Sequence, residues 1–117
     1  MSDIKRFRIG KRLSEVVVHN GVAYLAGQVP EDASVGIQQQ TEQVLAAIDS
    51  LLAEVGSDKT RILKAQIFLA NMSEFDGMNK AWDAWVPAGQ PPARATVEAR
   101  LASPDLKVEI VVTAALK

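Results

Sequence analysis

The chain has 117 residues, which is enough for one hydrophobic core but not for two, so we expect a single domain over residues 1–117. A net charge of −1, with 48 % apolar and 23 % charged residues, argues against a polycation that coats nucleic acid. The absence of cysteine excludes thiol nucleophiles, thiolate metal ligands and disulfides. The sequence shows neither a membrane helix of about 20 apolar residues nor the apolar core of a signal peptide, so we expect a cytoplasmic protein with no membrane partner.

The first quarter of the chain carries three candidate strands. Residues 4–9 are weakly strand-like, and two apolar, β-rich runs follow at 15–19 and 22–26. Asn20-Gly21 separates these two runs, and both residues of such a tight turn need positive φ. The sequence therefore predicts a β-hairpin here.

The middle of the chain alternates helix and strand. Apolar residues at helical spacing predict a helix over residues 35–55, with Gly56 placed for a left-handed C-terminal cap. A strand is predicted at 62–69, and a second helix follows from about residue 73. The second helix has large apolar residues at helical spacing, which we interpret as packing residues: Phe75, Met78, Trp82 and Trp85.

Two strands are predicted at the C-terminal end, at about residues 93–101 and 107–116. Each has one apolar face: Ala95, Val97, Ala99 and Leu101 in the first, and Val108, Ile110, Val112, Ala114 and Leu116 in the second. We expect the two amphipathic helices to cover these faces, which gives a two-layer α+β domain with both helices on one side of a sheet. The other sheet face mixes small, apolar and charged residues, so we expect association through it.

Arg94 and Glu109 are the candidate chemical residues of these strands. Arg94 is either a surface arginine or a bidentate anchor for a carboxylate. Glu109 is either a cross-strand partner of Arg100 or a lysine, or a partly buried carboxylate that positions water and shuttles a proton. Since the two strands run in opposite directions, we expect Arg94 and Glu109 to lie about 20 Å apart along one sheet face. A site that uses both would then lie between subunits.

Other chemistries find little support in the sequence. His19 has no second histidine or cysteine nearby, so no transition-metal site is predicted. No glycine-rich phosphate loop is present. The N-terminal segment is locally basic, which is typical of a solvated edge and leaves nucleic-acid binding as a weaker alternative. Its cations are Lys5, Arg6, Arg8, Lys11 and Arg12.

Several short motifs occur in the order seen in one known family. They are Gly27-Gln28-Val29-Pro30, Gln40-Thr41, Asn79, Pro92-Ala93-Arg94-Ala95-Thr96-Val97-Glu98 and Lys107-Val108-Glu109-Ile110. In this order they make nearly the whole chain similar to the RidA family, also called YjgF, and residues 67–70 and 79–86 resemble its YoaB-type branch most. The resemblance implies a chorismate-mutase-like fold, with a mixed six-stranded sheet and two helices on one face. It also implies a homotrimer with clefts between subunits.

The resemblance also implies an activity. Archetypal members hydrolyse reactive enamines and imines, such as 2-aminoacrylate and 2-iminopropionate, to 2-keto acids and ammonia without a cofactor, and so remove intermediates that leak from pyridoxal-phosphate enzymes. Carried across, Arg94 binds the substrate carboxylate and Glu109 activates or orients water. Gly27 and Asn79 line the cleft, and Thr96 is a substrate-binding residue at the position of a family cysteine.

The chain departs from archetypal members at two further positions. Leu13 stands near the place of a site tyrosine, and Ala26 replaces a serine. These changes reshape the pocket and favour one alternative, a binding or regulatory protein that holds a small 2-imino or 2-keto carboxylate without turnover. A further alternative, an RNA-cleaving translation inhibitor, rests on the basic N-terminus.

Overall fold

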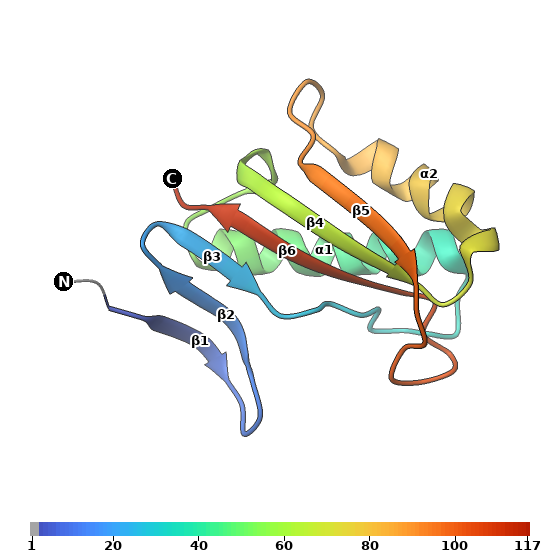
Figure 1. Cartoon of the computed structure of the whole chain (residues 1–117), viewed down its shortest axis with the longest axis horizontal. Helices are drawn as coiled ribbons and strands as arrows, with labels where there is room; N and C mark the ends of the chain where they lie inside the picture. The colour runs from blue at the N-terminus through green and yellow to red at the C-terminus, as the bar shows by residue number, and fades with distance from the viewer. Residues whose placement is uncertain (1–2) are drawn as a thin grey trace.

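The computed structural model describes residues 3–117, which form one mixed six-stranded sheet and two helices. The strands are β1 (Lys5–Ile9), β2 (Ser14–His19), β3 (Val22–Leu25), β4 (Ile62–Leu69), β5 (Ala93–Glu98) and β6 (Val108–Ala115). The helices are α1 (Ile37–Glu54) and α2 (Phe75–Trp85), with short 3-10 turns at Lys59–Arg61 and Met72–Glu74. The strand order is β1-β2-β3-β6-β4-β5, and β4 and β5 pair in parallel while the other neighbours are antiparallel (Figure 1).

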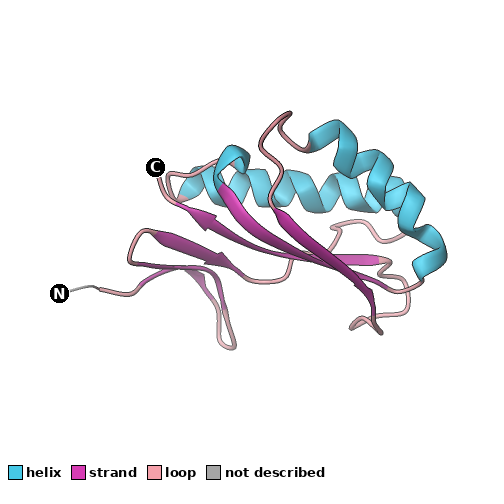
Figure 2. Ribbon diagram, turned by 45° about the horizontal axis from the view of Figure 1, so that its top comes forward, coloured by secondary structure: helices cyan, strands magenta, loops and turns pink. Residues whose placement is uncertain are grey.

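Both helices lie on the same side of the sheet, so the predicted two-layer α+β architecture is confirmed (Figure 2). Among the described residues, no helix is long and apolar enough to cross a membrane. The predicted hairpin is also confirmed, because β2 pairs with β3 through a turn in which Asn20 and Gly21 have φ of 51° and 77°. The first helix ends as predicted, since Gly56 follows it with φ of 78°.

The core fills the space between the sheet and the helices. Its largest fully buried side chains include Leu45, Ile48 and Leu52 of α1 and Met78 of α2. The predicted apolar face of β6 is confirmed, because alternate residues of β6 from Val108 onward are buried. The two helices approach closely at Gly77, where an added Cβ would lie 2.5 Å from Cγ2 of Ile37.

The prediction for the last-but-one strand is wrong in its faces. β5 ends at Glu98, and its Arg94 and Thr96 pair with the fully buried Ala65 and Ile67 of β4, so they lie on the side covered by helices. The apolar Val97 lies on the open face and is 44 % exposed. The alternation of residues defines two faces but does not say which one the helices cover. At this sheet edge, α2 offers aromatic and amide groups that suit an arginine.

Candidate functional site

Arg94 lies under α2, where three side chains hold its guanidinium. Its Nη1 donates a hydrogen bond to Oδ1 of Asn79 at 2.7 Å. Its Cζ lies 5.2 Å from the ring centroid of Trp82 and 5.8 Å from that of Phe75. Phe75, Asn79 and Trp82 recur at helical spacing, so one face of α2 supplies all three contacts. We call these four residues the arginine half-site.

The arginine half-site can still bind an anion. Asn79 accepts one hydrogen bond from Arg94 but carries no charge, and the two rings attract the cation without neutralising it. Nε and Nη2 of Arg94 form no hydrogen bond within residues 3–117. A guanidinium with free N–H groups and a fixed plane is suited to bind a carboxylate.

Thr96 follows Arg94 on the same face of β5. Its Oγ1 atom is buried and has no hydrogen-bond partner among the described residues. A buried hydroxyl without a partner costs free energy, which a ligand that reaches it would recover. Thr96 therefore belongs with Arg94 as a candidate ligand group.

Glu109 lies in β6 between the fully buried Val108 and Ile110, so it is on the open face of the sheet. Its carboxylate lies against Gly27, where an added Cβ would be 2.0 Å from its Oε2. Two backbone hydrogen bonds between Gln28 and Ile110, of 2.9 and 3.0 Å, fix this approach. We call Gly27 and Glu109 the carboxylate half-site, in which glycine leaves room for the carboxylate.

The cross-strand alternative for Glu109 finds no support in the structure. No arginine or lysine within residues 3–117 forms an ion pair with Glu109. Arg100 follows the end of β5, beyond the paired part of that strand. The Glu109 carboxylate is therefore available to water or to another molecule.

The structure does not bring Arg94 and Glu109 together, and the expectation that they share one sheet face is wrong. Arg94 is level with Ala65, which pairs with Val112, whereas Glu109 pairs with Phe68. The offset is three residues, about 10 Å along the strands rather than about 20 Å, because the pairing of β4 with both strands places Arg94 level with Val112 and not with the far end of β6. The side chains point to opposite faces, so one subunit cannot place both against one small ligand.

A pocket of about 710 Å³ lies at the C-terminal end of β5 and in the loop after it. It is lined by Glu98, the following loop, Ala70 and Leu106, and neither Arg94 nor Glu109 takes part. This pocket of the single chain therefore includes neither half-site. Leu13, at the turn between β1 and β2, is 55 % exposed.

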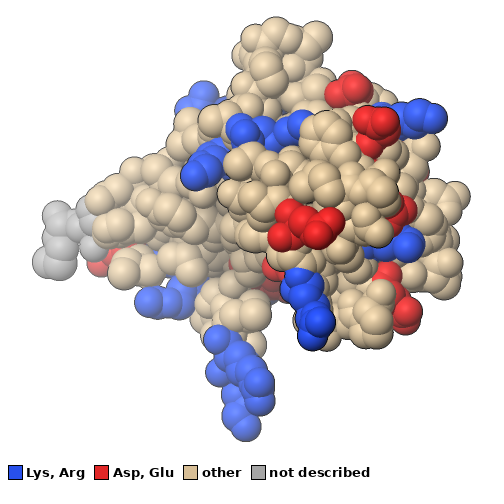
Figure 3. Space-filling model, turned by 45° about the vertical axis from the view of Figure 1, so that its right-hand side comes forward, with Lys and Arg blue, Asp and Glu red and all other residues tan. Residues whose placement is uncertain are grey.

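Charge elsewhere on the molecule is dispersed. On the face in Figure 3, basic groups are separated and acidic groups lie among them, without one continuous basic surface. Nε of Arg8 forms an ion pair with Oε2 of Glu54 at 3.0 Å, so one positive charge of the basic N-terminal segment is paired within the chain. The pKa of Asp58 is lowered to about 2, first by the hydroxyl of Thr60 and then by Lys117. Among the described residues, no group of three or more His, Cys, Asp or Glu could hold a metal ion.

Phe75 and Trp82 have a role that the sequence did not predict. Their helical spacing predicted packing, and Trp82 is indeed 5 % exposed, but both also hold Arg94. The available signal was the position of Asn79 between them on the same helical face. Without knowing that α2 covers β5, this signal does not point to an arginine.

The chain belongs to the family described as endoribonuclease L-PSP, whose model matches residues 4–116. It is 54 % identical over 113 residues to a RutC family protein of Haemophilus ducreyi, with 97 % of each chain covered. It is 49 % identical over 113 residues to the RutC family protein YoaB of Escherichia coli K12, covering 97 % of this chain and 98 % of that one. These relatives confirm the resemblance to the YoaB-type branch.

Structural comparison agrees with the sequence relatives. A crystal structure of a YjgF family member from Neisseria meningitidis superposes with a TM-score of 0.96 and is 50 % identical, covering 98 % of this chain and 96 % of that one. A more distant relative is the chloroplastic Reactive Intermediate Deaminase A of Arabidopsis thaliana, 30 % identical over 109 residues. The match covers 88 % of this chain and 58 % of that protein.

Proposed function

We propose that this protein hydrolyses small 2-imino acids, and their enamine tautomers, to 2-keto acids and ammonia. The observation that carries the proposal is the Arg94 guanidinium, held by Asn79 and two aromatic rings with N–H groups left for a carboxylate. The carboxylate of Glu109, which lies against Gly27 and has no ion-pair partner within residues 3–117, supplies the second group that the reaction needs. The name of the Arabidopsis relative supports the same class of reaction.

The proposed site lies between two subunits of a homotrimer. The opposite faces of Arg94 and Glu109 support a site completed by a second chain. The open sheet face also supports association, because it exposes large side chains such as Tyr24 and Val97, at 49 % and 44 %. The number of subunits comes from the resemblance to the family.

The proposed reaction needs one anchor and one proton carrier. Arg94 binds the substrate carboxylate in a bidentate manner, which fixes the position of the adjacent C=N carbon. Glu109 accepts a proton from a water molecule as its oxygen bonds to that carbon. As the C–O bond forms, the C=N electron pair moves to the nitrogen, which takes up the proton from Glu109 to give a neutral carbinolamine. Glu109 then accepts the hydroxyl proton of the carbinolamine and passes it to the nitrogen as the C–N bond breaks, so that ammonia and the 2-keto acid leave. No redox change occurs, and one water is consumed for each imine.

The experiment measures pyruvate release from 2-iminopropionate, which an amino-acid oxidase generates in place. The wild type should accelerate release, whereas Arg94→Ala should match the spontaneous rate. Lys64→Ala is a matched control, because it removes an exposed cation from the neighbouring strand without touching Arg94. Equal acceleration by the wild type and Arg94→Ala would contradict the proposal.

A carboxylate-binding protein without turnover is the second candidate function. The observation that favours it is the arginine half-site itself, which can hold a carboxylate before any contribution from Glu109. A 2-keto acid that raises the melting temperature of the wild type but not of Arg94→Ala, with no imine hydrolysed across a panel of side chains, would select this candidate.

A further inference from the structure

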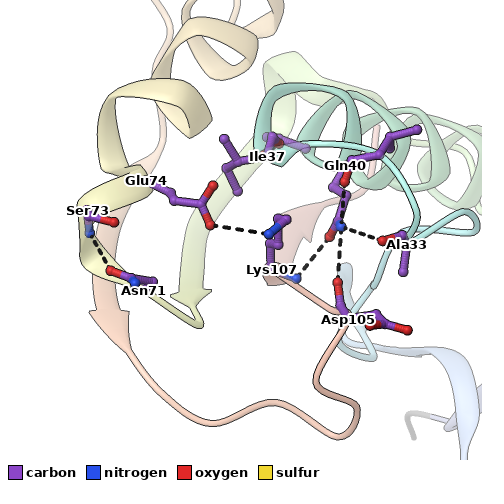
Figure 4. Close-up of polar contacts among 10 residues, drawn as sticks. Ala33, Ile37, Gln40, Asn71, Ser73, Glu74, Asp105 and Lys107 are labelled. Atoms are coloured by element: carbon purple, nitrogen blue, oxygen red, sulfur yellow. Dashed lines mark hydrogen bonds and ion pairs between the residues drawn. The ribbon is translucent and has the colours of Figure 1, made fainter.

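The side chain of Gln40 joins two loops that are far apart in the sequence. Gln40 projects from the first turn of α1 and is fully buried. Its Nε2 donates to the carbonyl oxygens of Ala33, Val35 and Asp105, at 3.1, 3.0 and 3.1 Å. Its Oε1 accepts a hydrogen bond from the backbone N–H of Lys107 at 2.9 Å. Figure 4 shows the carboxamide between the loop before α1 and the segment that enters β6.

These two loops flank the carboxylate half-site. Lys107 is two residues before Glu109, and the segment with Ala33 continues the loop that starts after Gly27. Lys107 is held from two other directions as well, since its carbonyl accepts from the N–H of Ala70 at 3.0 Å and its Nζ lies 3.7 Å from Oε1 of Glu74. The start of β6 is therefore fixed by backbone and side-chain contacts just before Glu109.

We propose that Gln40 is a positioning residue for Glu109. Its carboxamide sets the separation between the loop that follows Gly27 and the strand that carries Glu109, and so holds the carboxylate over the glycine. No polar atom of Gln40 is left for substrate, because each is bonded to backbone. Gln40 thus acts through Glu109 and not on the reacting atoms. The catalytic part of this inference rests on the proposed imine hydrolysis.

The chemistry of Gln40 suits this position better than other buried residues would. A carboxamide can donate to carbonyl groups on one side and accept from an N–H on the other. An apolar side chain of similar size, such as methionine, would fill the space but leave these backbone groups without partners. The loops would then separate to reach water, and the distance between Gly27 and Glu109 would change.

The test compares Gln40→Met with Ser57→Ala. Ser57 is also buried, and its Oγ donates to the carbonyl of Ala115 at 2.6 Å, so the control removes a similar bond at the opposite end of β6. Turnover of 2-iminopropionate is measured below the melting temperature of each variant. Amide hydrogen exchange is measured at Gln28 and Ile110, whose mutual hydrogen bonds fix Gly27 beside Glu109.

Gln40→Met should lower kcat by about tenfold to a hundredfold. KM should change less than about twofold, because Arg94, which binds the substrate carboxylate, is untouched. Exchange at Gln28 and Ile110 should accelerate. Ser57→Ala should leave kcat and exchange at those two amides as in the wild type. A Gln40→Met protein whose kcat and exchange match those of Ser57→Ala would overturn the inference.

Two further outcomes are decided by the same measurements. If Gln40→Met does not fold, Gln40→Glu takes its place, because it keeps an acceptor for the N–H of Lys107 while losing the amide donors. If the wild type hydrolyses no imine, the proposed function fails. The positioning of Glu109 is then judged by exchange alone: unchanged exchange in the variant overturns it, and faster exchange supports it.

Discussion

Mixing two inactive variants tests whether one site draws on two subunits. Arg94→Ala removes the carboxylate anchor, and Glu109→Gln removes the proton acceptor. Loss of two charge-assisted hydrogen bonds, at about 1.5–3 kcal/mol each, predicts that kcat/KM of Arg94→Ala falls at least about 100-fold. Loss of a general base predicts a fall of about 100-fold or more for Glu109→Gln. Each variant alone should therefore have almost no activity.

The opposite faces of Arg94 and Glu109 determine what the mixture does. If each site takes its arginine from one subunit and its glutamate from the next, random co-assembly gives about a quarter of the sites two intact residues. The mixture, refolded together or co-expressed with two affinity tags, should then recover about a quarter of wild-type activity. If both residues came from one chain, no mixed assembly would contain an intact site.

The control mixes Arg94→Ala with Asn79→Ala. These residues contact each other in one subunit, through the 2.7 Å hydrogen bond, so they belong to the same half of any shared site. Every mixed site then contains an altered arginine half-site, and the activity should not exceed the mean of the two parents. Recovery in this control, or no recovery with Glu109→Gln once co-assembly is verified by the tags, would refute the division of the site between subunits.

Three more predictions follow from close contacts and charge. Gly27→Ala places a methyl group 2.0 Å from the present position of Oε2 of Glu109, so kcat should fall at least about tenfold in the wild-type background but not further in Glu109→Gln; an additive loss would contradict this cause. Gly77→Ala should destabilise the fold, because overpacking at about 1–3 kcal/mol exceeds the helix-propensity gain of about 1 kcal/mol. In the Ile37→Ala background, the further change Gly77→Ala should no longer lower the free energy of unfolding measured in urea, because Cγ2 of Ile37, which lies 2.5 Å from the new atom, is then absent. The pKa of Asp58 is lowered to about 2, so its stabilising contribution is present above its ordinary pKa of 3.8 and is lost as the pH falls toward 2. Melting curves at several pH values should show a shallower acid slope for Asp58→Asn, and identical slopes would count against this account.

Local signals in the sequence were sufficient to predict several secondary-structure features. Asn20-Gly21 supplies the positive φ values that its turn requires, and Gly56 does the same at the end of α1. The alternation in β6 correctly identified its buried face, because its apolar residues Val108, Ile110, Val112 and Ala114 occupy every second position along the strand. Such features depend on neighbours in sequence, which is why they can be predicted without a fold.

The faces of β5 could not be predicted in the same way. β5 is an edge strand. Which of its two faces is covered depends on how α2 packs across it. The contact of Arg94 with Trp82, and that of Gly27 with Glu109, joins segments whose relation depends on the whole topology. The candidate residues came from the order of the motifs, whereas their grouping into two half-sites required the structure.

The separation of Arg94 from Glu109 has a chemical consequence. An arginine and a glutamate within reach of each other in one chain would form an ion pair, and each would then have to lose its partner before binding substrate or water. Here Arg94 is oriented by a neutral oxygen of Asn79 and by aromatic rings, so its charge stays available. Glu109 is placed against the backbone of Gly27 with no cation beside it in the described chain. A site completed by the next subunit can therefore receive a carboxylate at one end and a water molecule at the other, with both protein charges still unpaired.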